Sequence, residues 1–168
     1  AREVLVRVFT RLGVHKVRLT GGEPLLRPGF IELVGRIAAI EGITDLALTT
    51  NAILLPRHAE ALKEAGLSRV TVSLDSLDEE VFQTMAGNRG SVREVLEGIR
   101  AAEAAGFKKL KINTVVQRGI NDHTVLDLVD HFRSTVHTVR LIEFMDVGNV
   151  NHWNRQLVVP SAELLKTV

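Results

Sequence analysis

Short runs of β-branched and apolar residues alternate with helical stretches along this chain of 168 residues, and few folds permit such alternation. The β-type runs lie near residues 16–20, 45–51, 69–75, 109–116 and 138–145. The helical stretches lie near residues 29–40, 56–65, 81–85 with 91–105, and 121–133. Strict alternation of this kind implies parallel strands that are joined by right-handed crossovers. The sequence therefore predicts one α/β domain that covers residues 1–168.

Polar and apolar residues alternate within the first four runs, so the two faces of the predicted sheet differ in character. One face carries Lys16, Arg18, Thr20, Ala47, Thr49, Asn51, Thr71, Ser73, Asp75, Lys109, Lys111 and Asn113. The other face carries Val17, Leu19, Leu46, Leu48, Val70, Val72, Leu74, Leu110 and Ile112. A doubly wound sheet would be apolar on both faces, and a closed eight-stranded barrel would have an apolar interior. We therefore expect an incomplete TIM-type βα barrel of about five parallel strands, with helices on its outer face. The alternative is a two-layer sheet whose polar face is merely solvated.

The polar face concentrates positive charge. Four cations from three of the runs are expected to converge there: Lys16, Arg18, Lys111 and Arg140. At about 8 Å and an effective dielectric constant near 20, each like-charge pair would cost roughly 2 kcal/mol before screening. A polyanionic ligand would relieve this repulsion. Phosphates are the natural candidates, because Arg and Lys bind them through charge-assisted hydrogen bonds.

The sharpest local motif directly follows the first run and reads Thr20-Gly21-Gly22-Glu23-Pro24. The two glycines allow a ligand to approach the backbone closely, and Pro24 fixes φ where the chain leaves the turn. Glu23 presents a carboxylate that can accept a hydrogen bond from an ammonium group. The turn therefore suits an amino-acid moiety, whereas a bare Gly-Gly would indicate only an ordinary turn between a strand and a helix.

The charge balance and the absence of cysteine exclude several classes of site. Twenty-one Lys and Arg against 20 Asp and Glu leave a net charge of +1, so no general basic excess points to nucleic acid or to an anionic membrane. No apolar run approaches the length of a membrane span, and the N-terminus lacks a signal-peptide pattern, so we expect a cytoplasmic location. Without cysteine, the chain has no ligand for thiolate-bound zinc or for a cysteine-ligated iron–sulfur cluster. The six histidines show no metal-ligand spacing, and we expect them on the surface, with no metal site.

Both ends of the chain fall within helical patterns. Apolar residues from Val4 to Leu12 recur at helical spacing with no N-cap before them, and Ser161 is a candidate N-cap after Pro160. We therefore expect residues 1–168 to be the central part of a barrel that is truncated at both ends. The alternative is a complete protein with short terminal helices.

The glycine motif and its flanks resemble the signature of the GTP 3′,8-cyclase family, radical S-adenosylmethionine enzymes of molybdenum-cofactor biosynthesis. The matching segment is Arg18-Leu19-Thr20-Gly21-Gly22-Glu23-Pro24-Leu25-Leu26-Arg27. Further segments agree in order and spacing, namely Leu48-Thr49-Thr50-Asn51, Val72-Ser73-Leu74-Asp75-Ser76-Leu77, Lys111-Ile112-Asn113 and Arg140-Leu141-Ile142-Glu143-Phe144-Met145. Gly-Gly-Glu-Pro alone would indicate only the radical S-adenosylmethionine superfamily, whereas the flanks and later segments favour the cyclase family.

The resemblance implies roles for individual residues. S-adenosylmethionine would contact Gly21, Gly22, Glu23, Ser73 and Met145. GTP would contact Arg18, Thr49 and Lys111, with further support for its phosphates or ribose from Lys16 and Arg140. Strand alternation would place Arg140 and Met145 on opposite faces unless the strand bulges or ends near Glu143.

The reaction implied by the resemblance converts GTP to its 3′,8-cyclised product through a 5′-deoxyadenosyl radical. No side chain of this chain is expected to act as a nucleophile, and Asp75 and Asp78 are expected to cap a helix rather than to serve in acid–base catalysis. The family carries two [4Fe-4S] clusters, for which this chain holds no cysteine ligand, so the isolated chain is expected to be inactive as a cyclase.

Three alternatives stay open. Another radical S-adenosylmethionine enzyme, such as a peptide-modifying member, would share Gly21 to Glu23 but has no reason to keep the cation cluster. A sugar-phosphate lyase or isomerase barrel could use Lys111 as a Schiff base, although no acid–base partner is evident. The third alternative is a non-catalytic nucleotide-binding module. A homodimer is a further expectation, because exposed strand edges favour self-association.

Overall fold

The strands and helices occur in the predicted order in the computed structural model, which describes residues 2–147 and 153–168. The strands are β1 (Lys16–Leu19), β2 (Asp45–Thr50), β3 (Arg69–Ser73), β4 (Lys111–Val116) and β5 (Thr138–Glu143). The helices are α1 (Arg2–Arg11), α2 (Phe30–Ala38), α3 (Leu55–Glu64), α4 (Glu79–Ala86), α5 (Val92–Ala104), α6 (Val125–Arg133) and α7 (Ser161–Thr167). Short 3₁₀ helices lie at Pro24–Leu26, Asp122–Thr124 and Arg155–Leu157.

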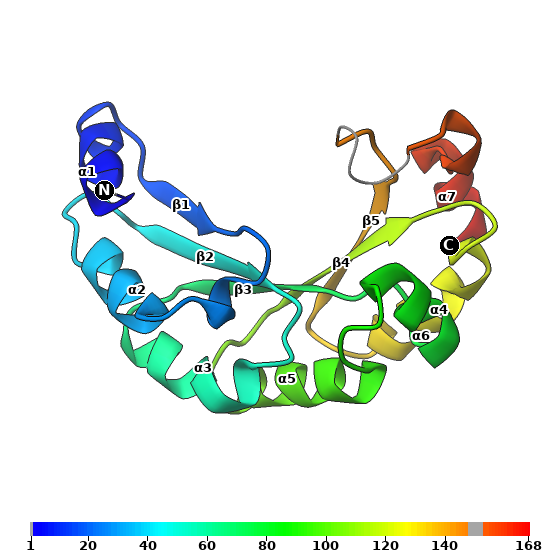
Figure 1. The fold of residues 1–168 in the computed structure, drawn as a ribbon, viewed down its shortest axis with the longest axis horizontal. Coiled ribbons are helices and arrows are strands. Elements are labelled where there is room, and N and C mark those ends of the chain that lie inside the picture. Colours follow the sequence, from blue (N-terminus) through cyan, green and yellow to red (C-terminus); the bar gives the residue numbers. More distant parts are fainter. Residues whose placement is uncertain (1, 148–152) are drawn as a thin grey trace.

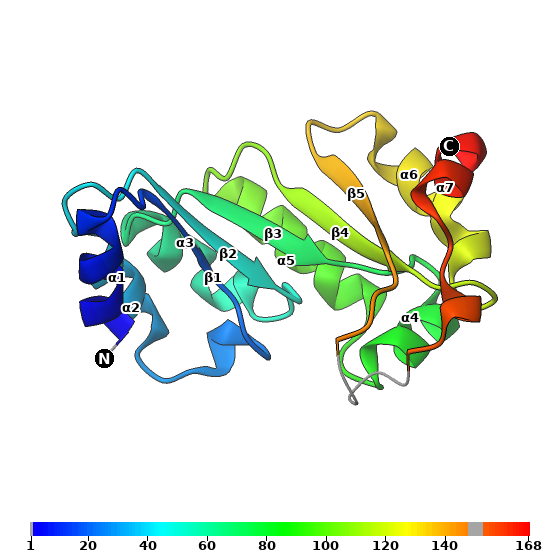
Figure 2. The same cartoon turned by 90° about the horizontal axis from the view of Figure 1, so that it is seen from above.

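The strands form one parallel sheet in the order β1-β2-β3-β4-β5, in which each strand pairs with the next along the chain. The sheet curls, and α2, α3 and α5 lie along its convex side while its concave side is open (Figure 1). The view from above shows the strands lying over this helical layer (Figure 2). The prediction of an incomplete βα barrel with helices on its outer face is therefore confirmed.

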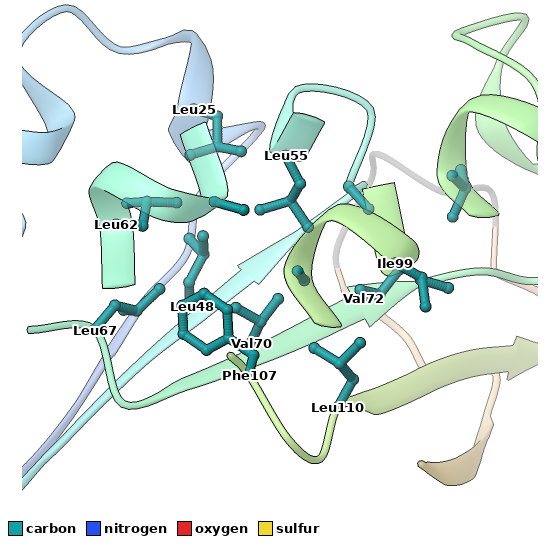
Figure 3. Packing of buried hydrophobic residues seen from close by; sticks show 14 of the residues in the cluster. Leu25, Leu48, Leu55, Leu62, Leu67, Val70, Val72, Ile99, Phe107 and Leu110 are labelled. Atoms are coloured by element: carbon teal, nitrogen blue, oxygen red, sulfur yellow. The ribbon is translucent and has the colours of Figure 1, made fainter. Parts of the chain in front are cut away.

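The hydrophobic core lies between the sheet and the helices. The strand residues that were predicted to face the helices are largely buried in one cluster, which includes Leu46, Leu48, Val70, Val72, Leu74, Leu110 and Ile112. Figure 3 shows part of this cluster, in which Leu55 and Leu62 of α3 and Ile99 of α5 lie near the strand residues. Each fully buried side chain of this kind contributes roughly 1.5–3 kcal/mol to folding. The apolar face read from alternate positions is thus the face that holds the half-barrel together.

Local capping signals fix several helix ends. Asp78 and Ser91 accept hydrogen bonds from amides three residues ahead, at 3.0 and 3.3 Å, and are the N-caps of α4 and α5. The predicted capping role of Asp78 is thus confirmed. The predicted N-cap Ser161 is wrong, because Pro160 occupies that position in α7. The Ser161 hydroxyl donates instead to the Glu143 carboxylate at 2.5 Å. A charged acceptor from the end of β5 therefore takes the hydroxyl that would otherwise serve as a cap.

Three strand boundaries differ by two residues from the predicted ones. β3 ends at Ser73, so Asp75 lies beyond it, and β4 begins at Lys111, two residues later than predicted. β5 ends at Glu143, so Met145 lies outside the strand. Because the carboxyl ends of parallel strands share one edge of the sheet, residues that follow the strands gather there.

No helix in the described part of the chain is long and apolar enough to cross a membrane.

Candidate functional site

A cavity of about 340 Å³ lies where the residues that follow β1, β2 and β3 meet. It is lined by Thr20, Gly21, Gly22, Glu23, Thr49, Thr50, Asn51, Ser73, Asp75, Phe82, Ala86 and Arg89. Its volume is in the range of small-molecule sites, and its position at the carboxyl edge of a parallel sheet is typical of them. Of the residues predicted to bind S-adenosylmethionine, the structure brings Gly21, Gly22, Glu23 and Ser73 together here. Met145 does not line this cavity.

The glycine turn forms one wall of the cavity. A Cβ atom built on Gly21 or Gly22 would meet no heavy atom within 4 Å, so both glycines open onto empty space. Behind the turn, Pro24 and Leu25 are buried at the start of a 3₁₀ helix and fix the path of the chain. The missing side chains therefore leave room for a ligand beside a main chain that is held in place.

The Glu23 carboxylate anchors this turn to the end of β2. Its Oε1 atom accepts hydrogen bonds from the Thr50 hydroxyl at 2.8 Å and the Leu25 amide at 3.0 Å. Its Oε2 atom accepts a hydrogen bond from the Asn51 amide at 2.8 Å. The sequence predicts that this carboxylate faces a ligand, whereas most of its acceptor capacity is used within the protein. A carboxylate offers about four acceptor positions, so one is left for an ammonium group.

Polar side chains at the end of β3 and in the middle of β4 lie on the concave side of the sheet. Ser73 is exposed and pairs in register with Asn113, which in turn pairs with Arg140 of β5. The Oδ1 atom of Asn113 is buried and has no hydrogen-bond partner among the described residues. A buried acceptor without a donor costs free energy, so a ligand hydroxyl would stabilise it. Strand alternation predicts that Asn113 lies on this face, but it indicates no role for its side chain.

Asp75 also lines the cavity, and the prediction that it caps a helix is wrong. Its Oδ1 atom accepts a hydrogen bond of 2.8 Å from the amide of Val115, which lies 40 residues further along the chain. Burial raises the pKa of Asp75 to about 6, and the bond from Val115 offsets part of that effect. Asp75 therefore joins the end of β3 to β4, a contact that no local sequence pattern could show.

Arg18 lies across the concave face and links three strands. Its Nη1 atom donates to the hydroxyl of Thr49 at 2.9 Å and to the hydroxyl of Thr71 at 3.1 Å. These two threonines are paired in register between β2 and β3. The structure thus places the predicted GTP-binding residues Arg18 and Thr49 in direct contact, and it holds the guanidinium in a fixed orientation on the face where a ligand would bind.

Lys111 lies near other cations of this face. Its backbone pairs in register with Thr71 on one side and Thr138 on the other. Burial lowers the pKa of Lys111, and the charges of Arg69, Arg140 and Arg18 lower it further. The convergence of Arg18, Lys111 and Arg140 that the sequence suggested is therefore present in the structure.

The concave face also holds an ion pair that was not predicted from the sequence. Arg69 Nε donates to Asp45 Oδ1 at 2.7 Å, and a second bond joins Arg69 Nη2 to Asp45 Oδ2. The bond from Arg69 lowers the pKa of Asp45, and the charges of Arg69, Lys16 and Arg18 add to this effect. Both partners continue the polar alternation toward the start of their strands, and that alternation could have identified them. We call the five basic residues of this face the concave cations: Lys16, Arg18, Arg69, Lys111 and Arg140.

The end of β5 resolves the conflict over Met145. Since the strand ends at Glu143, strand alternation does not govern the direction of Met145, whose side chain is exposed. Trp153 donates a hydrogen bond from Nε1 to the carbonyl of Phe144 at 3.3 Å. The chain on either side of the undescribed residues 148–152 therefore meets beside the end of β5.

The expectation that the histidines lie on the surface is wrong for His137. Its side chain is only 2% exposed, and its Nε2 atom lies 3.1 Å from the Glu103 carboxylate. Its Nδ1 atom accepts a hydrogen bond from the Leu110 amide at 3.4 Å, because the turn before β5 packs between α5 and β4. His152 lies outside the described residues. The described ranges contain no group of His, Asp and Glu side chains that could hold a metal ion.

Comparison with known proteins links the chain to one superfamily. The model of the radical SAM superfamily matches residues 2–132. A protein of Xanthomonas axonopodis pv. citri named GTP 3′,8-cyclase is 60% identical over 162 residues, which are 96% of this chain and 48% of that protein. The GTP 3′,8-cyclase of Aquifex aeolicus is 48% identical over 163 residues, which are 97% of this chain and 51% of that protein. The chain therefore spans about half the length of the curated relatives it matches.

Solved structures agree with the fold. Methylornithine synthase superimposes with a TM-score of 0.71 at 15% identity, over 96% of this chain and 50% of that chain. At this identity the likeness supports the βα architecture and carries no information about the ligand.

Proposed function

The chain belongs to the radical SAM superfamily, and from that membership we propose that it forms the central part of a GTP 3′,8-cyclase, an enzyme of molybdenum-cofactor biosynthesis. Relatives of that name match along nearly the whole chain. The observation that carries the proposal is the group of concave cations. Among the described residues, the carboxylate of Asp45 offsets part of their positive charge. A triphosphate is the kind of ligand that such a surface would bind.

The cavity beside the glycine turn suits S-adenosylmethionine. The open side of Gly21 and Gly22 gives room for its methionine part, and the remaining acceptor position of Glu23 suits its ammonium group. The Ser73 hydroxyl and the orphaned Oδ1 atom of Asn113 suit the hydroxyls of its ribose. Met145 is proposed to contact the adenine, as the sequence suggests. When bound, S-adenosylmethionine would supply radical chemistry, and these residues would orient it.

Arg18, Thr49 and Lys111 are proposed to hold the phosphates of GTP, with Lys16 and Arg140 as further support. Arg18 is suited to this role because Thr49 and Thr71 already fix its guanidinium, so that less side-chain freedom is lost when an anion binds. Bound phosphates would also relieve the repulsion that lowers the pKa of Lys111. The protein's part is thus to orient the nucleotide and to offset its charge.

The residues present do not fit an iron–sulfur cluster. The chain contains no cysteine, so it offers no thiolate for either of the two [4Fe-4S] clusters that the family resemblance implies. We therefore expect the chain alone to bind ligands without cyclising GTP. We also propose that the protein forms a homodimer and is located in the cytoplasm.

Calorimetric titration of the chain with GTP, at low and at high salt, tests the proposal. The test variant is Lys16→Ala/Arg18→Ala/Lys111→Ala. The matched control is Arg57→Ala/Arg93→Ala/Arg100→Ala, which removes three exposed cations from the convex helices and changes the net charge equally. We expect binding that weakens with salt, that is lost in the test variant and that persists in the control.

Two other results would contradict the proposal. Equal loss of GTP binding in both triple variants would show that net charge, rather than a site, attracts the nucleotide. A folded chain that binds S-adenosylmethionine but not GTP would favour another radical SAM enzyme over the cyclase. Circular dichroism of all variants establishes that each is folded.

A further inference from the structure

A second cavity, of about 510 Å³, lies at the opposite end of the sheet from the glycine turn. It is formed where β3 and β4 begin and by the loops that lead into them. Its cationic lining residues are Lys63, Arg69, Lys108, Lys109 and Lys111. The strands separate here, because the first paired residues of β3 and β4 are Thr71 and Lys111 while β3 already begins at Arg69. We call this cavity the lysine pocket.

Positive charge in the lysine pocket is only partly neutralised. Of the residues that the structure describes, no aspartate or glutamate lines the cavity. Arg69 pairs with Asp45 across the sheet, but no ion pair within 4 Å involves the four lysines in the described part of the chain. Four ammonium groups around one concave volume repel one another, and a multivalent anion would offset that repulsion.

The position of Lys63 is fixed by packing. Its Nζ atom lies 5.0 Å from the centroid of the Phe107 ring, which is a cation–π contact. Phe107 is 2% exposed and belongs to the core, so the ring provides a rigid support. Gly106 has φ +88° and turns the chain from α5 toward Lys108 and Lys109. The core therefore holds in place both the last turn of α3, which carries Lys63, and the loop before β4, which carries Lys108 and Lys109.

The chemistry of the lining favours a small polyanion over a nucleic acid. The overall charge of the chain is +1, and the cations are gathered around a concavity instead of along an extended surface. Lysine acts as a point charge for phosphate, and it requires no planar geometry of its partner.

We propose that the lysine pocket binds an oligophosphate, with Lys63, Lys108 and Lys109 as the residues that define it. The pocket shares Lys111 with the proposed GTP-binding residues, but the other three lysines lie outside the sheet: Lys63 in the last turn of α3, and Lys108 and Lys109 in the loop before β4. Two sources of the phosphate chain fit this chemistry: the tail of a nucleotide held on the concave face, or a free inorganic oligophosphate.

Titration with inorganic tripolyphosphate tests the pocket without reference to GTP. The test variant is Lys63→Ala/Lys108→Ala/Lys109→Ala, and the control is Arg57→Ala/Arg93→Ala/Arg100→Ala. We expect the affinity for tripolyphosphate to fall about tenfold or more in the test variant and to stay within about twofold in the control. Because loss of the Lys63–Phe107 contact could unfold the triple variant, Lys108→Ala/Lys109→Ala serves as a second test, since both side chains are exposed.

A second pair of titrations distinguishes the two sources. If the tail of a nucleotide enters the pocket, the affinity for GTP falls with that for tripolyphosphate in the lysine variants, whereas the affinity for GMP does not. If the anion is free oligophosphate, GTP and tripolyphosphate bind together, and GTP affinity is unchanged in the variants. Equal binding of tripolyphosphate by the chain and by the folded lysine variants would overturn the proposal, since the anion would then bind the concave cations alone. Failure of GTP to bind would contradict the proposed function but leave this result intact.

Discussion

The amide of Val115 in β4 donates a hydrogen bond of 2.8 Å to the carboxylate of Asp75, which follows β3. The side chain of Asn121 completes the link, because its Nδ2 atom donates to the carbonyls of both Asp75 and Val115, at 2.8 and 2.9 Å. The end of β3, which borders the glycine-turn cavity, is thus joined to β4 through a carboxyl group whose pKa is raised to about 6 from an ordinary value of 3.8. Its ionisation is therefore coupled to folding.

Replacing this carboxyl by an amide should remove a pH dependence. Because the pKa of Asp75 is higher in the folded than in the unfolded state, the folded state binds more protons between pH 3.8 and about 6. The stabilising contribution of Asp75 is full below pH 3.8 and is lost as the pH rises through 6. Asp75→Asn keeps an acceptor for Val115, so it should raise the free energy of unfolding at pH 7 by about 1–3 kcal/mol. Urea denaturation at pH 4 and pH 7 measures this, and an equal gain at both pH values would contradict it.

Glu23 gives a prediction about the glycine turn. Glu23→Ala removes the acceptor of three hydrogen bonds, to Leu25, Thr50 and Asn51, and should lower the free energy of unfolding by about 2–4 kcal/mol. Glu23→Gln keeps one carbonyl acceptor and should lose less. Glu41→Ala, at an exposed position, serves as the control and should change the value by no more than about 0.5 kcal/mol. Denaturant titration compares the three, and a loss in Glu23→Ala no larger than in the control would refute an anchoring role.

The sequence was sufficient to predict the parallel βα architecture, the helical face and most of the concave cations, because those features depend on local periodicity. Alternate positions from Lys16 to Asn113 separate core from polar face without knowledge of which strands pair. Arg69 and Asp45 are the first residues of β3 and β2 and follow the same alternation. The polar face predicted for these strands began only at Thr71 and Ala47, and extending it by one alternate position in each strand includes both residues.

The contacts that could not be predicted join residues far apart in the chain. Asp75 meets an amide 40 residues away, and the Glu23 carboxylate meets Thr50, 27 residues away, at a core position of β2. The burial of His137 depends on α5 and the start of β4 closing around it. The local sequence around such a residue is equally typical of a helix cap, a ligand-binding residue or a surface residue. Its partners are therefore decided by tertiary packing alone.

Two glycines in helix interiors should respond in opposite directions to the same substitution. A Cβ on Gly98 of α5 would lie 2.1 Å from the carbonyl oxygen of Ala52, so Gly98→Ala forces apart α5 and the turn after β2 and should cost about 3 kcal/mol or more. A Cβ on Gly35 of α2 meets nothing closer than 4.0 Å, so Gly35→Ala should stabilise the chain by about 0.5–1 kcal/mol. Thermal denaturation of both variants checks the contrast, and destabilisation by Gly35→Ala would show that the helical layer has less room than the structure indicates.

Lys111 should show a conflict between stability and ligand binding. Its charge is disfavoured by burial and by Arg69, Arg140 and Arg18, so Lys111→Met, which keeps the aliphatic stem, should raise the free energy of unfolding by about 0.5–1 kcal/mol at low salt. The same change removes a proposed phosphate contact and should weaken GTP binding about tenfold. Added salt screens the repulsion, so the gain in stability should shrink as salt rises. Lys166→Met, at an exposed position of α7, should change neither quantity appreciably. Denaturation and calorimetry on the same samples test both effects. A variant that loses stability as well as affinity would show that Lys111 supports the fold. The claim that repulsion among the concave cations lowers stability and is relieved by a bound anion would then be wrong.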